Sequence, residues 1–418
     1  DSPPVHADHQ SNVLLDKQFV WGPVDDDFAK ADHQLSFSVV WGRNSTVPIE
    51  TFGVVAEWNV WEQILDIRAS VQMPKYADQI ARALGLAGNQ VRVHYDIDVG
   101  GSYGVKRGIK HAVLTGYLAR KLHRPVRLIE DRLENMRAGD AHGPERKFDI
   151  SVAFDQDGTV RSMKMRALDN AGAYAGRAPF QLGKPIGAIV GPYRIGSVAY
   201  QAISVTTNKA VQEAVRGFGQ APTNYAIETA IDRVAAYLQM DRLALRQHNL
   251  IRADEFPYLI PSGSTYDSGD YQATLTSAMK LADVEGFSDR RKASESLGKK
   301  RGIGYSTYIE ACGIAPSAVA GALGARAGLY ESAEVRVHPT GSVTVFTGSH
   351  SHGQGHETTF AQIVGDKLGV PIENIDVVHG DTDKGPFGMG TYGSRSLAVG
   401  GSAISKACDK IIEKGKKV

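Results

Sequence analysis

The stretch SHSHGQGHETT, Ser349 to Thr359, decides how the rest of this chain is interpreted. It follows the apolar run Val343 to Phe346 and precedes apolar residues at the helical spacing i, i+3, i+4 and i+8, so we expect a strand-to-helix turn. Glycines such as Gly353 and Gly355 let the backbone come close to a ligand, and the N–H groups that open a helix attract anions. The stretch therefore predicts a site for a phosphate or another anion.

Length and charge narrow the class of protein. With 418 residues the chain exceeds the size at which one core stops growing, so we expect two or more globular domains. Lys and Arg number 47 against 46 Asp and Glu, a formal net charge of +1. This balance gives no electrostatic reason to expect a nucleic acid or a membrane surface as partner.

The chain contains two cysteines, Cys312 and Cys408. Two thiols are too few for a disulfide framework, a structural zinc site or the four thiolates of an iron-sulfur cluster, so any such cluster is expected on another chain. No apolar run approaches the roughly 18 to 20 residues of a membrane span, and the N-terminus has no initiator Met and no signal-peptide pattern. We expect no membrane insertion, a cytoplasmic location and a chain that begins inside a larger gene product.

Periodicity along the chain predicts its organisation. Residues 1–35 are polar and are expected to form a connecting arm, residues 36–287 a first domain, the charged stretch 288–301 a linker, and residues 302–418 a second domain. Strands are expected at 35–41, 54–58, 64–71, 91–99, 126–129 and 375–378, hairpins at 148–167 and 334–347, and helices at 105–122, from about 220 to 238, after 359 and at 397–412.

A strand, a glycine turn and a helix recur in both halves. The turns are Gly100 to Gly104, Arg216 to Pro222, Ser349 to Thr359, and Gly388 to Ser396. This recurrence predicts an α+β protein with two related mixed α/β domains that face one ligand, the second being incomplete in this chain.

Each turn alone also has a simpler interpretation. GGSYG departs from the GxGxxG fingerprint of dinucleotide binding, and a turn of this kind can merely connect two elements. His352 and His356 lie four positions apart, but the glycines between them disfavour a helical pair that ligates a metal. His379 with Asp381 and Asp383 fits a polar turn, and single aromatics such as Tyr103 and Phe218 are more often core residues. Only the coincidence of the turns favours function.

Five blocks resemble the molybdenum-binding large subunit of the xanthine oxidase family, the molybdenum hydroxylases. They are VGGSYGVK at Val99–Lys106, HRPVRLIEDRLENM at His123–Met136, VRGFGQAP at Val215–Pro222, HGQGHETT at His352–Thr359 and TYGSRS at Thr391–Ser396. The blocks stand in the order of the family and span about three hundred residues, and Val47 to Glu50 resembles the segment before the first block.

The resemblance implies a pyranopterin that holds molybdenum, in bacterial members usually molybdopterin cytosine dinucleotide. The metal is held by the dithiolene sulfurs, so no direct protein ligand is expected, and the protein contributes positioning and electrostatics. Tyr103 and Phe218 would wall a pocket for a planar substrate. The cofactor-binding residues that it implies are Gly101, Tyr103, Gly104, Arg216, Gly217, Phe218, Gly219, His352, Gly353, Gln354, Gly355, Thr391, Tyr392, Gly393, Ser394, Arg395 and Ser396.

The resemblance also implies a reaction and partners. The reaction is hydroxylation of an electron-poor carbon with water as oxygen source, and two electrons leave through 2Fe-2S clusters, commonly to FAD, on an iron-sulfur subunit and an FAD subunit. The Glu that acts as general base in the family lies in a Gly-rich segment near the C-terminus and is not found before Val418. We therefore expect it on a remaining large-subunit segment, in a split or cleaved subunit.

Departures from the family narrow the small-molecule substrate. Carbon monoxide dehydrogenases place a copper-binding Cys in the loop that corresponds to Val215–Gln220, where Gly217 stands here, and xanthine oxidases carry a Glu where Arg107 follows Lys106. An N-heteroaromatic compound or an aldehyde remains. Two other interpretations stay open, a nicotinamide-dependent dehydrogenase built on residues 91–122 and a noncatalytic scaffold subunit that holds the cofactor.

Overall fold

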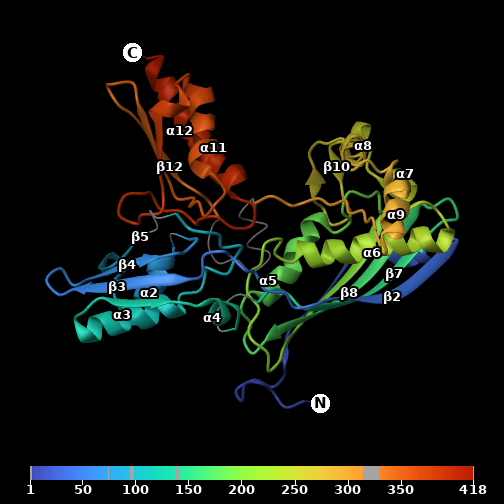
Figure 1. Cartoon of the computed structure of the whole chain (residues 1–418), viewed down its shortest axis with the longest axis horizontal. Coiled ribbons are helices and arrows are strands. Elements are labelled where there is room, and N and C mark those ends of the chain that lie inside the picture. The colour runs from blue at the N-terminus through green and yellow to red at the C-terminus, as the bar shows by residue number, and fades with distance from the viewer. Residues whose placement is uncertain (1, 74, 95–97, 138–141, 314–328, 418) are drawn as a thin grey trace. The chain divides into compact units, whose positions relative to one another are not determined.

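The computed structural model describes residues 2–73, 75–94, 98–137, 142–313 and 329–417 (Figure 1). The chain divides into two compact units, and each unit is built from separate segments of the sequence. Unit 1 comprises Asp1–Arg43, Pro144–Lys209 and Gly217–Ala311, and unit 2 comprises Asn44–Gly143, Ala210–Arg216 and Cys312–Val418.

Unit 1 is centred on a five-stranded mixed sheet. Its order is β1 (Val13–Trp21), β9 (Ser197–Thr206), β8 (Val160–Gly172), β7 (Arg146–Phe154) and β2 (His33–Trp41). Only β8 and β9 run parallel, and the other neighbours are antiparallel. The hairpin expected at 148–167 is confirmed as β7 and β8, and its turn is closed by Gly158 with φ +91°.

Helices cover one face of this sheet, as the long α6 (Gln220–Leu238) shows in Figure 1. The expected apolar face of this helix is confirmed, since Ile227, Ile231 and Val234 are buried among core residues from β7 and β8. The helices α5 (Ala178–Gly183) and α7 (Arg242–Asn249) extend the layer. A short helix, α1 (Val24–Lys30), also contacts the sheet and buries Val24 and Phe28 against Ala153.

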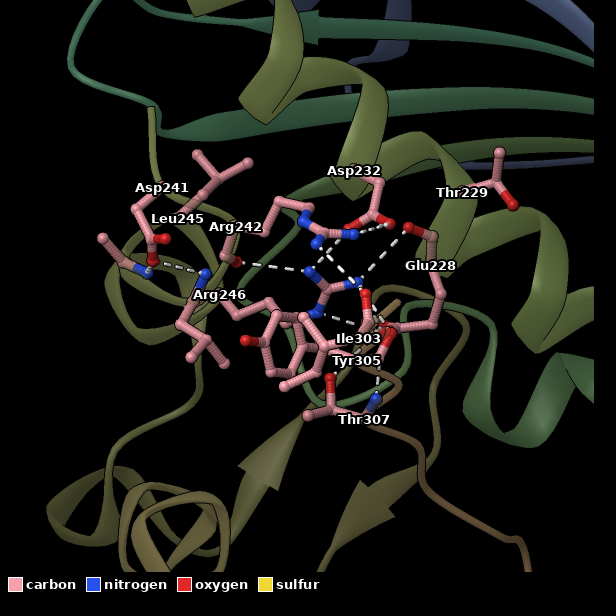
Figure 2. A network of polar contacts seen from close by, with 12 residues as sticks. Glu228, Thr229, Asp232, Asp241, Arg242, Leu245, Arg246, Ile303, Tyr305 and Thr307 are labelled. Carbon is pink, nitrogen blue, oxygen red and sulfur yellow. Dashed lines mark hydrogen bonds and ion pairs between the residues drawn. The ribbon is translucent and has the colours of Figure 1, made fainter. Parts of the chain in front are cut away.

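A buried polar network ties the end of unit 1 to its helices (Figure 2). The fully buried Arg246 of α7 donates to Glu228 at 3.0 Å and to Asp232 at 2.7 Å, both on α6. The Glu228 carboxylate also accepts the backbone N–H of Thr307 at 2.9 Å. Because these bonds hold the segment around Thr307 on α6, residues up to Ala311 pack with unit 1.

Unit 2 begins with a four-stranded sheet in the order β5 (Val91–His94), β4 (Ile64–Ala69), β3 (Gly53–Asn59) and β6 (Val126–Ile129). Helices α2 (Tyr76–Leu84) and α3 (Lys110–Leu122) pack on it. The helix expected from Val105 starts five residues later. Residues 105–109 stay in the turn, where the fully buried Lys106 forms an ion pair with Glu50 at 2.8 Å.

The remainder of unit 2 is a three-stranded sheet with two helices. The antiparallel pair β12 (Ala333–Val337) and β13 (Val343–Thr347) confirms the expected hairpin, and β14 (Ile375–Val378) runs parallel to β13. Helix α11 (His356–Leu368) buries Phe360 and Val364 in this core. The expected small-residue helix opens as a π-helix over Ser396–Gly401 and continues as α12 (Ser402–Gly415).

The remaining elements are short or exposed. Among the helices that the structure describes, none combines the length and the apolar character that crossing a membrane requires. These elements are the 3₁₀ turns Gly88–Gln90, Lys184–Ala188, Ala253–Glu255 and Ile372–Asn374, the helices α4 (Arg132–Arg137), α8 (Tyr271–Leu281) and α9 (Phe287–Ser296), and the strands β10 (Tyr258–Leu259) and β11 (Thr265–Tyr266).

The α+β expectation is confirmed, and the expected domain bounds stay a prediction, although the local structure of two segments differs from what the sequence suggested. Residues 1–35 are not simply a connecting arm, because β1 pairs along its length with β9 and β2 begins at His33. The stretch 288–301 is largely the exposed helix α9, in which Ser294 is the buried residue. Its charged composition reflects a solvated helix surface. The compact units also interleave in sequence, whereas continuous domains at 36–287 and 302–418 were expected.

Candidate cofactor-binding site

The first glycine turn, in unit 2, is held open by left-handed backbone. Gly101, Tyr103 and Gly104 have φ of +88°, +57° and +117°. A Cβ on Gly104 would lie 1.9 Å from the carbonyl oxygen of Ala214, and the N–H of Arg216 donates to the carbonyl of Tyr103 at 2.8 Å. The structure thus brings the first block and the start of the third together. The Tyr103 side chain remains 42% exposed.

The HGQG turn joins β13 to α11, as expected. Gly353 and Gly355 have φ of +114° and +70°, and a Cβ on either would meet nothing within 4 Å. The turn is therefore open above its backbone. Helix α11 begins at His356, with Gly355 as its N-cap, so the N–H groups of its first turn point towards this end.

The side chain of Gln354 stabilises this turn through two contacts with His352. Its Oε1 accepts the backbone N–H of His352 at 2.7 Å, and its Nε2 lies 2.8 Å from Nε2 of the His352 ring. Because the amide nitrogen can only donate, Nε2 of His352 accepts and its Nδ1 carries the proton. That Nδ1 is buried and has no hydrogen-bond partner among the described residues. A longer contact with the backbone of His350, which raises the pKa of the ring, is the interaction that a ligand would replace.

The environment of His352 keeps its ring neutral. Burial lowers the pKa of His352 to about 4, and the charges of His356, Lys106 and Arg216 lower it further. These influences show that the cations of the first and third blocks lie near the HGQG turn within unit 2. Because Lys106 is paired with Glu50, the exposed Arg216 is the better candidate to attract an anionic ligand.

The TYGSRS turn adjoins the same part of unit 2. Gln72 donates to the carbonyl of Thr391 at 3.3 Å, and the guanidinium of Arg107 lies 5.0 Å from the centre of the Tyr392 ring. Gly393 and Ser394 have φ of +58° and +55°, so the backbone turns sharply. The hydroxyls of Thr391 and Ser396 lie 2.8 Å apart.

Arg395 does not fit the expected role as a cationic fork for phosphate. It is 1% exposed, and its guanidinium contacts the Glu331 carboxylate at 2.5 Å and donates to the carbonyls of Gly390 at 2.8 Å and Tyr330 at 2.9 Å. These contacts stabilise the conformation of the TYGSRS turn from its buried side. Arg395 is therefore a positioning residue, and the exposed Arg216 is the better candidate for a direct contact with an anion.

The GFG turn lies in unit 1, at the start of α6. Gly217, Phe218 and Gly219 have φ of +98°, +42° and +85°, and a Cβ on Gly219 would lie 1.9 Å from the carbonyl oxygen of Gln181. The Phe218 ring packs 5.9 Å from that of Phe180, centre to centre. Since Tyr103 belongs to unit 2 and Phe218 to unit 1, the substrate pocket expected between them stays a prediction.

Gln220, the first residue of α6, is a candidate that the sequence did not single out. Its side chain is 9% exposed, and both the oxygen and the nitrogen of its amide are buried with no hydrogen-bond partner among the described residues. Such atoms are costly unless a ligand satisfies them. Gln220 directly follows Gly217, Phe218 and Gly219, whose backbone is left-handed. In the sequence, its place after GFG in the block VRGFGQAP is the signal that points to it.

Comparison with known proteins agrees with this geometry. Two models described as a molybdopterin cofactor-binding domain match residues 5–250 and 277–418. This chain belongs to the molybdopterin-binding large subunits of the molybdenum hydroxylases. The family resemblance expected from the five blocks is thereby confirmed.

Individual relatives show how much of such a subunit is present. The carbon monoxide dehydrogenase large chain of Hydrogenophaga pseudoflava is 34% identical over 96% of this chain and 51% of its own length. The nicotine 6-hydroxylase large subunit of Paenarthrobacter nicotinovorans is 31% identical over 99% and 51%. Quinoline 2-oxidoreductase of Pseudomonas putida 86 superposes with a TM-score of 0.89, at 31% identity over 98% and 52%. This molybdenum hydroxylase chain thus spans about half the length of these relatives.

The residues present fit the molybdopterin of the molybdenum hydroxylases. Within unit 2, Gly353 and Gly355 leave open space at a helix N-terminus beside the buried Nδ1 of His352. Within unit 1, taken by itself, Gln220 offers a buried amide with no hydrogen-bond partner among the described residues. A pterin carries both donors and acceptors on its edge, and its phosphate is anionic. No group of three or more His, Cys, Asp or Glu in the described part of the chain is arranged to hold a metal.

Proposed function

We propose that this chain binds molybdopterin cytosine dinucleotide and forms part of an enzyme that hydroxylates an N-heteroaromatic compound or an aldehyde with water as oxygen source. The observation that carries the proposal is the HGQG turn of unit 2, where Gly353 and Gly355 leave open space at the N-terminus of α11 beside the buried Nδ1 of His352. When bound, the cofactor supplies the two-electron oxidation of the substrate carbon.

The chain's own residues bind and orient. The N–H groups of the HGQG turn and the exposed Arg216 are proposed to hold the anionic part of the cofactor, and the amide of Gln220 its polar edge. His352 donates from Nδ1 because Gln354 fixes its tautomer. Arg395 keeps the TYGSRS turn in position through Glu331.

The proposed substrate class follows from two kinds of observation. Two relatives are named for reactions on nicotine and quinoline, and Tyr103 and Phe218 supply aromatic rings on the two turns. Carbon monoxide oxidation is disfavoured because Gly217, with φ +98°, stands where the resemblance places a copper-binding Cys. The iron-sulfur subunit, the FAD subunit, a further large-subunit segment that carries the base, and the cytoplasmic location are all parts of the proposal.

The test uses the complex as it is purified from cells together with its co-purifying chains. We expect about one molybdenum per chain by metal analysis and CMP after acid release of the cofactor. Quinoline, nicotine, benzaldehyde and carbon monoxide are then offered with an artificial electron acceptor in H₂¹⁸O, and we expect ¹⁸O in the product of a heteroaromatic or an aldehyde. Active enzyme without molybdenum would contradict the proposal.

Two outcomes would favour the other interpretations. Formation of reduced nicotinamide by protein that lacks molybdenum would support a nicotinamide-dependent dehydrogenase. Full molybdenum occupancy without turnover of any compound in the complete complex would support a noncatalytic scaffold.

A further inference from the structure

Three residues of unit 2 form a continuous chain of hydrogen bonds from the surface to the base of the HGQG turn. Glu357, in the first turn of α11, contacts Nε2 of His379 at 2.5 Å, and Nδ1 of His379 lies 3.1 Å from Nδ1 of His350. The Glu357 side chain is 50% exposed, that of His379 is 12% exposed, and His350 is fully buried. The chain thus connects solvent with the interior.

The geometry restricts where the protons lie. Two Nδ1 atoms at hydrogen-bond distance share one proton, so one ring donates and the other accepts. Nε2 of His379 faces a carboxylate, whose pKa is lowered by a backbone hydrogen bond and by His379 itself, against the opposing effect of burial. An ionised Glu357 accepts, so His379 carries a proton on Nε2.

This arrangement has two states that differ by one proton. In the first, His350 donates from Nδ1 to a neutral His379. In the second, His379 carries both protons beside the Glu357 carboxylate, and His350 accepts at Nδ1. Positive charge is thereby held next to Glu357 and not on the buried ring.

The groups around His350 support this distribution of charge. Burial, and then His379, His352 and His356, hold the pKa of His350 well below its usual range, while a backbone hydrogen bond with Val71 opposes them. Beyond His379, Asp381 pairs with His94 at 3.3 Å and with Lys384 at 3.3 Å. The low pKa of His350 therefore disfavours a doubly protonated, cationic ring at this buried position.

We propose that His350, His379 and Glu357 form a relay that carries protons from the base of the HGQG turn to solvent. This inference rests on the proposed function. Hydroxylation with water converts C–H and H₂O into C–OH, two electrons and two protons, and the electrons leave to the acceptor subunits. A proton that enters at Nε2 of His350 moves the Nδ1 proton of that ring to Nδ1 of His379, and both rings return to their starting tautomers before the second proton passes. The Nε2 proton of His379 then passes through Glu357 to water.

The first measurement needs neither cofactor nor substrate. Deuterium exchange at the imidazole C2 position, followed residue by residue in the purified complex by mass spectrometry, reports the pH at which each His titrates. Burial and then His379 lower the pKa of His350, so His379→Gln is expected to move the midpoint of His350 to higher pH. His338→Gln, a partly buried histidine bonded to Thr344 in the same unit, is the matched control. An unchanged midpoint in His379→Gln would overturn the coupling.

The second measurement separates proton transfer from the oxidation itself. The complex is mixed without oxygen with the compound that the panel above shows to be oxidised, and a pH-indicator dye is read beside the absorbance of the electron acceptors. We expect His379→Gln and Glu357→Gln to slow proton release by about a hundredfold while molybdenum content and the rate of the first reduction stay near wild type. Added imidazole is expected to restore proton release in His379→Gly.

The outcomes can be told apart. If reduction and proton release slow equally in these variants, His379 and Glu357 have a merely structural role. If proton release stays normal, the relay is overturned. Hydroxylation continues in both cases. If no compound is oxidised by the molybdenum-loaded complex, the proposed function and the relay fall together.

Discussion

Gly104 and Ala214 approach so closely that a Cβ on Gly104 would lie 1.9 Å from the Ala214 carbonyl oxygen. This contact joins the GGSYG turn to the segment that carries Arg216, and Gly104 also has φ +117°. Only glycine satisfies both demands.

Gly104→Ala is therefore expected to lower the free energy of unfolding by at least about 2 kcal/mol. It should also reduce molybdenum content, because the two turns separate. Gly42→Ala, which meets nothing within 4 Å, is the control. Chemical denaturation and metal analysis check both effects, and equal behaviour of the two variants would show that the contact is not needed.

Arg395 and Glu331 form a buried ion pair whose loss should affect folding first. Arg395→Ala leaves the Glu331 carboxylate buried without its partner, so we expect a loss of about 3–5 kcal/mol and, through the displaced turn, less bound cofactor. The exposed pair Arg336 and Glu334 offers a control, and Arg336→Ala should cost less than about 1 kcal/mol. If Arg395→Ala loses cofactor but keeps full stability, Arg395 contacts the cofactor directly.

Substitution of Gln220 should lower cofactor retention without lowering stability, unlike substitution of Arg395. The Gln220 amide is buried with both atoms unsatisfied, so Gln220→Met is expected to leave the stability of the cofactor-free protein unchanged or slightly higher. The same change should lower molybdenum retention, since a ligand loses two hydrogen bonds. Gln247→Met, on α7 of the same unit, should change neither. Normal retention in Gln220→Met would remove this residue from the site.

His356 makes unit 2 sensitive to mild acid. Burial, followed by the neighbouring His379, lowers the pKa of His356 to about 4, against an unfolded value of 6.5. The folded state holds this ring neutral, so its contribution is complete above pH 6.5 and is lost as the pH falls towards 4. The shift corresponds to roughly 3 kcal/mol.

The variant His356→Gln should flatten the dependence of unfolding free energy on pH between 6.5 and 4. Chemical denaturation at several pH values measures it, with the exposed His248 changed to Gln as control. The same slope in wild type and in His356→Gln would show that other groups cause the acid sensitivity.

Local pattern was sufficient for much of the fold. The hairpins β7–β8 and β12–β13, the apolar face of α6, and the strand-to-helix turn before α11 all follow from periodicity and glycine placement. Each of these features is set by residues close together in the sequence, where side-chain spacing and backbone freedom act directly. Strand β1 escaped prediction because its sequence, VLLDKQFVW, lacks the strict alternation of apolar and polar residues that marks a half-buried strand.

The sequence by itself determined the family, because five blocks stand in the order of the family and the glycines in four of them allow the positive φ angles that the structure shows. Only the tertiary structure decided what each side chain in and around these blocks does. Arg395 is paired with Glu331, the amide of Gln220 has no hydrogen-bond partner among the described residues, and His350 contacts His379, which in turn contacts Glu357. The physical reason is that hydrogen bonds and burial depend on which distant segments fold against a turn, and spacing along the chain does not record that. The HGQG turn was therefore predictable as a strand-to-helix turn, whereas the contact of His350 with His379 beside it was not.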